Sequence, residues 1–510
     1  MNLRIVLNLI SFLILLEGFA IALSAGVSFW MKDPLSDVLT LLSCGAATIL
    51  SGGLGALFTR SGEAPQRTGS REGFAAVVLG WGLISFFGAL PLICVSKLYW
   101  YDALFETISG FTTTGATVID SSLKLMNGSV LPNGIESLPY GILFWRAVTH
   151  WIGGLGIVVF FLAILPFLGS GSQALYNAEV PGVKMRSDQF TPRIAGTAKI
   201  LCMVYVCLTA LQSLLLYFGG MTLFDAVCHS FATLSTGGFS TKNSSIAFYR
   251  SGYIQLVIMI FMFLGSCNFL LHFRALTGLP LKECFNEEFR VYSLILLFTT
   301  LVIGFYLFFS KLTDPYSGNV LGGSFLHSFR AAAFQVISLS STTGFITADY
   351  TVWPPLCGVL LTGLMFLGGC GGSTSGGIKC MRVILLSKFS FSELQRNIFP
   401  RIVRNIRVNN LRADTSVINR VLGFFTIYML TLFLFQILLT AVCDMDLLTA
   451  FSASATCIGN VGPGFGRLSP VNSCSWISPG GKLLMALEML IGRLELYSVM
   501  IFFLPGFWKK

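Results

Sequence analysis

ISGFTTTGATVID, residues 108–120, holds a cluster of threonine and glycine that ends a short apolar segment. That segment, YDALFETISGF, has about 11 residues, whereas a helix needs about 20 to cross a bilayer. Similar pairs of a short segment and a cluster recur, and their clusters read ATLSTGGFSTKN (232–243), ISLSSTTGFITAD (337–349) and SASATCIGNVGPG (452–464). Their glycines lie roughly 105–125 residues apart, which indicates one unit repeated four times. These glycines are Gly115, Gly238, Gly344 and Gly459.

The composition of the chain indicates a membrane protein. Of its 510 residues, 54% are hydrophobic and only 11% are charged, whereas a soluble domain carries about 25% charged residues. Apolar runs of about 20 residues recur along the whole length. We therefore expect a polytopic all-α membrane protein and not a large soluble protein with buried helices.

The N-terminal segment, residues 1–26, resembles a signal peptide. Its apolar run is too long for one, however, and Glu17 interrupts it. We expect it to be retained as the first of two plain membrane helices, at roughly 4–29 and 36–59, which precede the repeated units.

The net charge of +10 would suggest a nucleic-acid partner in a soluble protein. Here the basic residues gather in alternate loops, so we expect membrane lipid and no nucleic acid as their partner. The positive-inside rule then places both termini and the basic loops in the cytoplasm. The densest basic set is Lys388, Arg396, Arg401, Arg404, Arg407 and Arg412.

Each short segment is best interpreted as a re-entrant half-helix. Non-helical backbone at membrane depth is tolerated only where protein buries it or where it lines a watery cavity. Four such units therefore predict four membrane–pore–membrane repeats around one central pore. A glycine-rich strand can turn its carbonyl oxygens inward to replace the hydration shell of an alkali cation, and the negative C-terminal end of each half-helix also favours cations. The clusters carry no ring of Asp or Glu, which argues against a divalent-cation filter.

The run GGCGGSTSGG, residues 368–377, allows two interpretations: a phosphate cradle or a break in a membrane helix. The spacing of a phosphate-binding loop fails, because Ile378 and Lys379 stand where that motif requires Lys and then Ser or Thr. The apolar stretch around it, roughly 355–389, is too long for one straight crossing. We expect a broken helix whose loop lies across the pore as a gate; the alternative is a passive kink.

Arg493 lies inside the last long apolar span. An arginine at mid-membrane is costly and usually faces a cavity or a partner, although an arginine near a helix end can snorkel to the surface. Two other classes of protein fit the sequence less well. A secondary transporter of the broken-helix type would show inverted repeats, whereas these run the same way, and an enzyme is not expected, since the chain has no HExxH and no G-x-S-x-G motif.

Several motifs together resemble the Trk/Ktr/HKT superfamily of potassium transporters. They are SREGF (70–74), TTTGAT, STGGFST, WIGGLGI (151–157), AEVPG (178–182), RIAGTAK (193–199), GGCGGSTSGGIK (368–379), ATCIGNVGPG (455–464) and GRLELY (492–497). The resemblance runs over almost the whole chain. It implies potassium uptake across the bacterial inner membrane through a pseudo-fourfold pore with two extra N-terminal helices, homodimeric assembly, and a cytosolic regulatory subunit of the TrkA type that binds NAD(H) or ATP/ADP. The alternative within the superfamily is a Na⁺/K⁺-permeating protein or a symporter coupled to H⁺ or Na⁺.

The resemblance also implies the site residues. It implies that the transported ion is K⁺ and that the chain holds no organic cofactor. Gly115 argues for potassium, because a serine there accompanies sodium preference in plant relatives. The loops are shorter and more irregular than those of tetrameric potassium channels, which predicts weak discrimination against Na⁺. The expected filter residues are Thr113, Thr114, Gly115, Thr236, Gly237, Gly238, Thr342, Thr343, Gly344, Cys457, Ile458 and Gly459.

For the gate, the resemblance implies that Arg493 faces the pore and binds carbonyls of the glycine-rich loop. The expected gate residues in that loop are Gly368, Gly369, Gly371, Gly372, Ser373, Thr374, Ser375, Gly376 and Gly377. The repeats then divide the chain into residues 1–65 for the N-terminal helices and 66–180, 181–284, 285–412 and 413–510 for the four units.

Overall fold

A computed structural model describes the chain at residues 3–59, 70–164, 190–276, 285–310, 312–313, 318, 322–400, 405–409 and 411–508. This part is almost entirely helical. The strands within it form one antiparallel hairpin of β1 (Arg407–Val408) and β2 (Leu411–Arg412). The motif AEVPG, several basic residues of the predicted cytoplasmic loops, and most of the predicted unit boundaries lie outside these residues.

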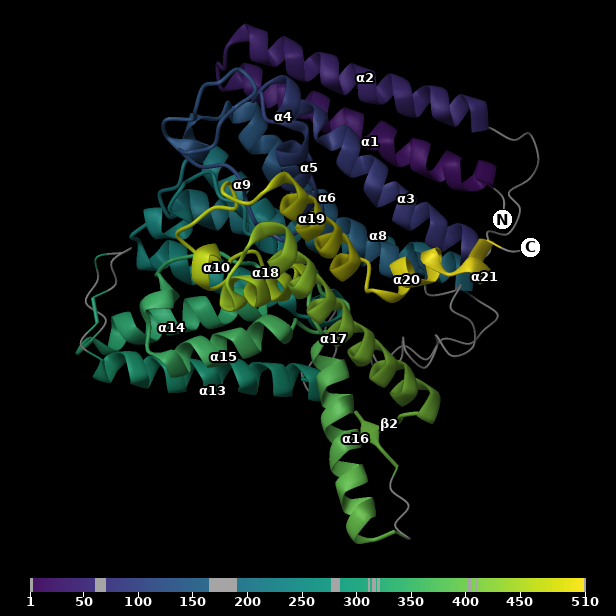
Figure 1. The fold of residues 1–510 in the computed structure, drawn as a ribbon, viewed down its shortest axis with the longest axis vertical. Coiled ribbons are helices and arrows are strands. Elements are labelled where there is room, and N and C mark those ends of the chain that lie inside the picture. The colour runs from purple at the N-terminus through teal and green to yellow at the C-terminus, as the bar shows by residue number, and fades with distance from the viewer. Residues whose placement is uncertain are drawn as a thin grey trace.

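Long apolar helices run side by side through the molecule (Figure 1). Among the described residues, six spans are long and apolar enough to cross a membrane, or seven if a helix pair bent by 105° is one span. The chain is therefore a multi-pass membrane protein, as its composition predicts. The six spans lie in α1 (Leu3–Trp30), α2 (Leu35–Thr59), α3 (Ser70–Gly88) with α4 (Leu90–Cys94), α8 (Phe190–Phe218), α13 (Glu287–Phe309) and α17 (Thr415–Cys443), and the bent pair is α10 (Gly252–Ser266) and α11 (Phe269–Leu276). A further long helix, α6 (Tyr140–Ile164), is not counted among them.

The predicted half-helices are short helices packed inside the bundle. They are α5 (Trp100–Phe111), α9 (Leu223–Leu234), α14 (Phe325–Ser340) and α18 (Leu447–Gly459), with 12, 12, 16 and 13 residues. Helix α14 is longer than expected because it begins at Phe325. Side-chain caps fix two of their starts: Thr222 Oγ1 accepts from Asp225 N at 3.1 Å, and Asp446 Oδ2 accepts from Thr449 N at 3.3 Å.

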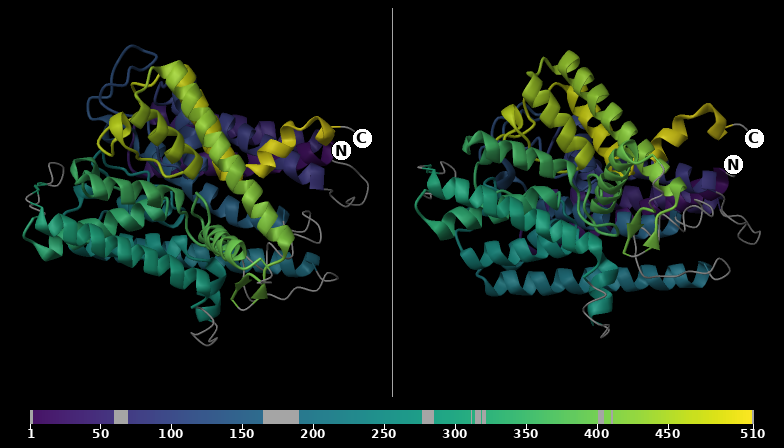
Figure 2. Two further views of the ribbon diagram at one scale, coloured as in Figure 1. Left: turned by 60° about the horizontal axis from the view of Figure 1, so that its bottom comes forward. Right: turned by 90° about the horizontal axis from the view of Figure 1, so that it is seen from below.

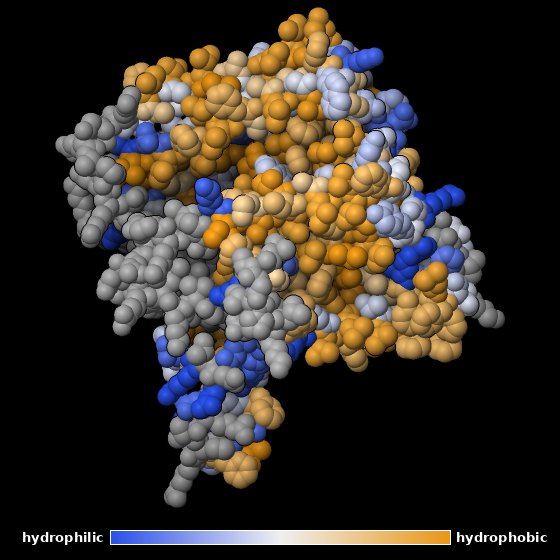
Figure 3. Space-filling view, turned by 180° about the vertical axis from the view of Figure 1, so that it is seen from behind, coloured by the Kyte–Doolittle hydropathy of each residue, from blue (hydrophilic) through white to orange (hydrophobic). Residues whose placement is uncertain are grey.

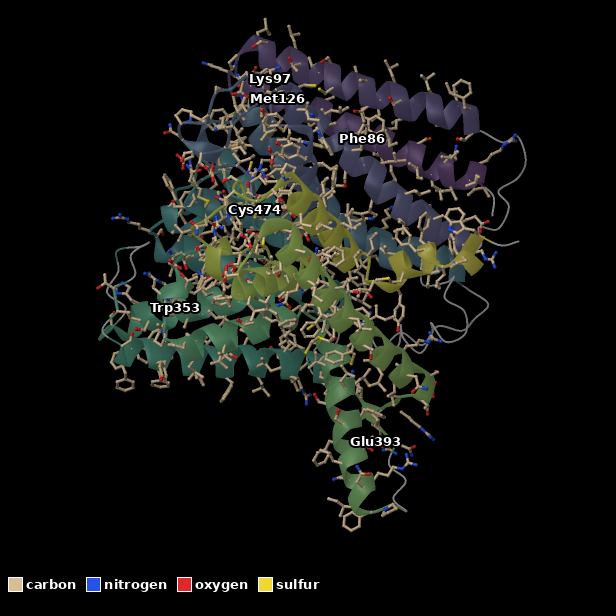
Figure 4. The ribbon with its side chains drawn as sticks, in the orientation of Figure 1. Phe86, Lys97, Met126, Trp353, Glu393 and Cys474 are labelled. Carbon is tan, nitrogen blue, oxygen red and sulfur yellow. The ribbon has the colours of Figure 1, made fainter. Side chains whose placement is uncertain are left out.

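The predicted break in the third unit is also present. Helix α15 (Pro355–Phe366) stops at the glycine-rich run, and α16 (Cys380–Ile398) begins after it and leaves the bundle across the direction of the spans (Figures 1 and 2). Glu393 lies on this projecting part (Figure 4). The chain ends with α19 (Pro479–Arg493), α20 (Tyr497–Phe503) and α21 (Pro505–Trp508); 3-10 turns are η1 (Gly134–Ser137), η4 (Ser245–Phe248), η5 (Tyr350–Val352) and η6 (Gly466–Leu468).

The surface agrees with a lipid environment. Apolar side chains cover most of the described face in Figure 3, while hydrophilic ones gather on the projecting helix and at the edges. Both termini lie at one end of the spans (Figure 1), and Lys97 and Met126 lie at the other end (Figure 4).

The backbones of helices α1 and α2 lie close together, because glycines line the contact between the two helices. A Cβ placed on Gly52 would lie 2.7 Å from Leu15 N, and one on Gly45 would lie 3.1 Å from Ala22 N. Small residues allow such close approach where lipid gives no hydrophobic drive for helix association.

Replacing Gly52 with valine should therefore push α1 from α2. We expect Gly52→Val to destabilise the protein by about 1–3 kcal/mol through overpacking, seen as a lower melting temperature of the detergent-solubilised chain. Gly53→Val is the matched control, because a Cβ there meets nothing within 4 Å. Equal melting temperatures for the two variants would contradict this account of the contact.

Candidate functional site

All the short helices end in the same hydrogen-bonded turn. In each, an amide just past the helix end bonds the carbonyl five residues back, and the residue before that amide has a left-handed backbone, which is a Schellman motif. The long bonds join Thr114 N to Ser109 O at 2.9 Å, Gly237 N to Ala232 O at 2.8 Å, Thr343 N to Ser338 O at 2.9 Å and Val461 N to Thr456 O at 2.9 Å. The left-handed residues are Thr113 (φ 53°), Thr236 (φ 56°), Thr342 (φ 59°) and Asn460 (φ 52°). The loops therefore correspond residue by residue.

This correspondence corrects the fourth predicted loop. Cys457, Ile458 and Gly459 form the last turn of α18 and not the loop after it. The residues that match Thr113, Thr114 and Gly115 are Asn460, Val461 and Gly462. The sequence offered a signal for this register, because asparagine is the residue other than glycine that most readily takes the left-handed conformation at a helix end.

The third residues of these loops close into a ring. Each is a glycine with positive φ, and the position that its Cβ would take is filled by a carbonyl oxygen of the next loop. These Cβ-to-oxygen distances are 2.1 Å from Gly115 to Gly237 O, 2.0 Å from Gly238 to Thr343 O, 2.3 Å from Gly344 to Val461 O and 2.4 Å from Gly462 to Thr114 O. The last contact returns to the first loop, so the loops surround a single axis. We call Gly115, Gly238, Gly344 and Gly462 the glycine ring.

All members of the glycine ring line a cavity of about 600 Å³. The cavity wall includes both acidic and basic side chains, among them Asp120 and Lys242. Burial raises the pKa of the Asp120 carboxyl, but hydrogen bonds from Ser473, Ser475 and Ser122 outweigh it, so the pKa lies below its ordinary value. Asp120 is thus charged at neutral pH and joins the loop of the first unit to that of the fourth. Cys474, labelled in Figure 4, belongs to the same wall.

Buried ion pairs hold the loops from behind. Glu106 on α5 bonds Arg146 on α6 at 2.7 Å and also accepts from Val118 N at 3.0 Å. Lys482 on α19 bonds Asp102 on α5 at 2.6 Å. The four residues are at most 3% exposed. Removal of one partner would leave a buried charge uncompensated, which makes such pairs strong positional constraints.

His150 explains why the second loop carries Gly237 where the other loops carry threonine or valine. Its Nδ1 lies 2.7 Å from Gly110 O, and its Nε2 accepts from Phe239 N at 3.1 Å. A Cβ on Gly237 would lie 2.4 Å from His150 Cγ. The imidazole therefore occupies the space of a side chain at the position where the other loops carry threonine or valine.

The glycine-rich loop, residues 367–379, folds against the same loops on the side away from the cavity. Gly368 N donates to Ile378 O at 3.0 Å, which closes the loop at its base. Gly376 N donates to the Thr342 hydroxyl at 2.8 Å, and the Thr374 hydroxyl donates to Leu234 O at 2.9 Å. The loop thus contacts the ends of the short helices, away from the cavity that the glycine ring lines.

Arg493 reaches this loop from α19. Its Nη1 donates to Thr374 O at 2.7 Å, its Nη2 donates to Gly153 O at 3.3 Å, and the residue is 2% exposed. The snorkelling alternative is therefore wrong. Glu495, two residues on, pairs with Arg382 of α16, which was not foreseen because the partners are far apart in sequence.

These features define a multi-pass helical membrane protein in which the loops after four short helices meet around one axis. The sequence model of the TrkH family, described as "Cation transport protein", matches residues 42–510. The chain belongs to the TrkH family, which is a family of transporters and not of enzymes.

Relatives of known name support this membership. The chain is 39% identical over 448 residues to the Trk system potassium uptake protein TrkH of Escherichia coli K12, covering 86% of each chain. It is 35% identical over 513 residues to the protein of the same name from Halomonas elongata, covering 100% of each. The crystal structure of the potassium transporter TrkH from Vibrio parahaemolyticus superposes with a TM-score of 0.86 at 33% identity over 100% of both chains.

The corrected register can be tested with two alanine substitutions. Gly462→Ala places a Cβ 2.4 Å from Thr114 O on a backbone with φ 94°, a conformation that costs a non-glycine residue about 1–3 kcal/mol. Gly459→Ala is the control, since its Cβ would lie 3.1 Å from the nearest atom, Met365 O. We expect Rb⁺ uptake by proteoliposomes to fall about tenfold more in Gly462→Ala than in Gly459→Ala, because 1.4 kcal/mol corresponds to a factor of ten. A larger loss in Gly459→Ala would restore the earlier register.

Proposed function

We propose that the chain takes up potassium ions through a channel-like pore along the axis of the glycine ring. The observation that carries this proposal is the closed ring of glycines and carbonyl oxygens at the ends of the short helices. Backbone carbonyls can replace the hydration shell of K⁺, and the helix C-termini add negative potential. The names of the relatives, which describe potassium uptake, support the choice of ion.

The proposed filter residues are those of the corresponding loops. They are Thr113, Thr114 and Gly115, Thr236, Gly237 and Gly238, Thr342, Thr343 and Gly344, and Asn460, Val461 and Gly462. No Asp or Glu occurs among them, which fits a monovalent ion. The loops differ in their side chains, so only the backbone is fourfold, and we expect modest discrimination between K⁺ and Na⁺.

We infer that the glycine-rich loop is the gate. It lies on the inner side of the filter loops, and its contacts to Thr342, Leu234 and Arg493 are polar and mostly to backbone. Such contacts can be exchanged for water when the loop moves, as a gate requires. The passive-kink alternative predicts no effect of the loop on flux.

The remaining expectations follow from the family resemblance. We propose a homodimer in the bacterial inner membrane, with both termini in the cytoplasm and a cytosolic subunit of the TrkA type that binds NAD(H) or ATP/ADP. A pore needs only the membrane potential, which favours cation entry by about 2.3 kcal/mol per charge per 100 mV. A symporter would instead need a second ion gradient.

The purified chain in proteoliposomes tests transport directly. We expect Rb⁺ uptake driven by an inside-negative potential alone, inhibited by K⁺ at low concentration and by Na⁺ at higher concentration. Empty liposomes provide the control. Uptake that requires a pH or Na⁺ gradient would favour the symporter, and complete insensitivity to Na⁺ would contradict the modest selectivity.

Shortening the glycine-rich loop tests the gate. Replacing Gly369–Gly377 with a shorter linker should raise Rb⁺ flux, because the segment beneath the filter is removed. Thr374→Val keeps the loop length and shape but loses the hydroxyl that donates to Leu234 O, and should raise flux less, since one hydrogen bond contributes about 0.5–1.5 kcal/mol. Unchanged or lower flux from folded, shortened protein would favour the passive kink.

A further inference from the structure

The start of α13 carries a buried glutamate that the sequence did not single out. Glu288 is 0% exposed. Its Oε1 accepts a hydrogen bond from Gly371 N at 2.9 Å and another from Met381 N at 3.0 Å. One carboxylate oxygen therefore joins the first half of the glycine-rich loop to the first turn of the helix that follows it.

This contact supplies a cap that α16 lacks in its own sequence. Lys379 at the N-cap of α16 makes no side-chain capping bond, so the carboxylate of Glu288 takes the place of the usual Ser, Thr, Asp or Asn oxygen. A negative charge is favoured at this end of a helix by the helix dipole. Bonds from amides to a carboxylate are also stronger than bonds between neutral groups.

The helix that carries Glu288 is itself fixed at this point. The side chain of Asn286 accepts from Phe289 N at 2.8 Å and caps α13. Glu287 N donates to Asn409 Oδ1 at 2.8 Å, and Glu287 Oε2 accepts from Asn409 N at 3.1 Å. Glu287 also pairs with Lys388 of α16. The first turn of α13 is thus bound to the β-hairpin and to α16, which gives Glu288 a rigid base.

Glu288 and Arg493 hold complementary groups of the loop. Arg493 binds a carbonyl at the middle of the loop from the fourth unit, and Glu288 binds amides at its first half and just past its end from the third. We propose that Glu288 is a positioning residue that keeps the glycine-rich loop in its closed position. This inference rests on the proposed role of that loop as the gate.

Substitutions at Glu288 test the inference by Rb⁺ flux into proteoliposomes. Glu288→Leu removes the acceptor and should raise flux about tenfold, a change of about 1.4 kcal/mol in favour of the open state. Glu288→Gln keeps Oε1 as an acceptor and should raise flux far less. Glu393→Leu is the matched control, because that glutamate on the projecting helix α16 has a side chain that is 45% exposed and lies 3.7 Å from its neighbour Arg396, so its loss should leave flux at the wild-type level. Equal flux in Glu288→Leu, Glu288→Gln and wild type would overturn the inference.

Thiol labelling separates positioning from general loosening. Cys370 in the loop is 1% exposed, and Cys357 in α15 is 0% exposed. In Glu288→Leu, peptide mass spectrometry should show faster modification of Cys370 with unchanged modification of Cys357. Equal acceleration at both cysteines would mean a loosened fold and would overturn the inference.

A double variant distinguishes failure of the inference from failure of the gate. If Glu288 acts through the loop, Glu288→Leu should add nothing to the flux of the shortened-loop variant, because interacting sites are not additive. Multiplying effects would overturn the role of Glu288 while leaving the gate intact. A shortened loop with no effect on flux would refute the gate and the inference together.

Discussion

The structure depends on one contact made at each of the corresponding loops: a glycine without a side chain against the carbonyl oxygen of the next loop. The contact requires positive φ at the glycine and at a residue two positions earlier, which is threonine in the first three loops. A β-branched residue in the left-handed region is a conformational outlier and costs about 1–3 kcal/mol. The surrounding protein must therefore enforce the loops, because the loop sequence alone would not adopt this shape.

The loop conformation is enforced by helices that pass close to the C-terminal ends of the short helices. A Cβ on Gly153 of α6 would lie 2.0 Å from Phe111 O, and one on Gly492 of α19 would lie 2.2 Å from Ile458 O. These two helices can pass so close to the carbonyl ends of α5 and α18 only because they carry glycine there. The pairs Glu106–Arg146 and Lys482–Asp102 then fix α5 to both α6 and α19. Close packing against glycine and buried ion pairs thus act together to position α5.

The features that could be predicted from the sequence are those that a local residue pattern encodes. Short apolar segments before Thr/Gly clusters predicted the half-helices, and a run of glycine inside an over-long apolar stretch predicted the break between α15 and α16. The register of the fourth loop was predicted wrongly, because Gly459 and Gly462 are both plausible turn glycines. Asn460 is the one local signal for the correct register, and the hydrogen-bond pattern decides it. The contacts of Glu288 and Arg382 could not be predicted, since each joins residues roughly 80–115 positions apart and no local pattern records such a pairing.

The pseudo-symmetry of the site belongs to the backbone and not to the side chains. His150 excludes a side chain at Gly237, and Asn460 replaces threonine and bonds both Thr114 Oγ1 at 3.0 Å and Met489 O at 2.9 Å. The broken span between α15 and α16 breaks the symmetry further, because its loop covers the inner side from one unit alone. That loop is held by hydrogen bonds to carbonyls, a hydroxyl and a carboxylate. In the gate that we propose, the loop would open by exchanging these bonds with water, without exposing a large apolar surface, and the cost of opening would be set by a few identifiable polar groups.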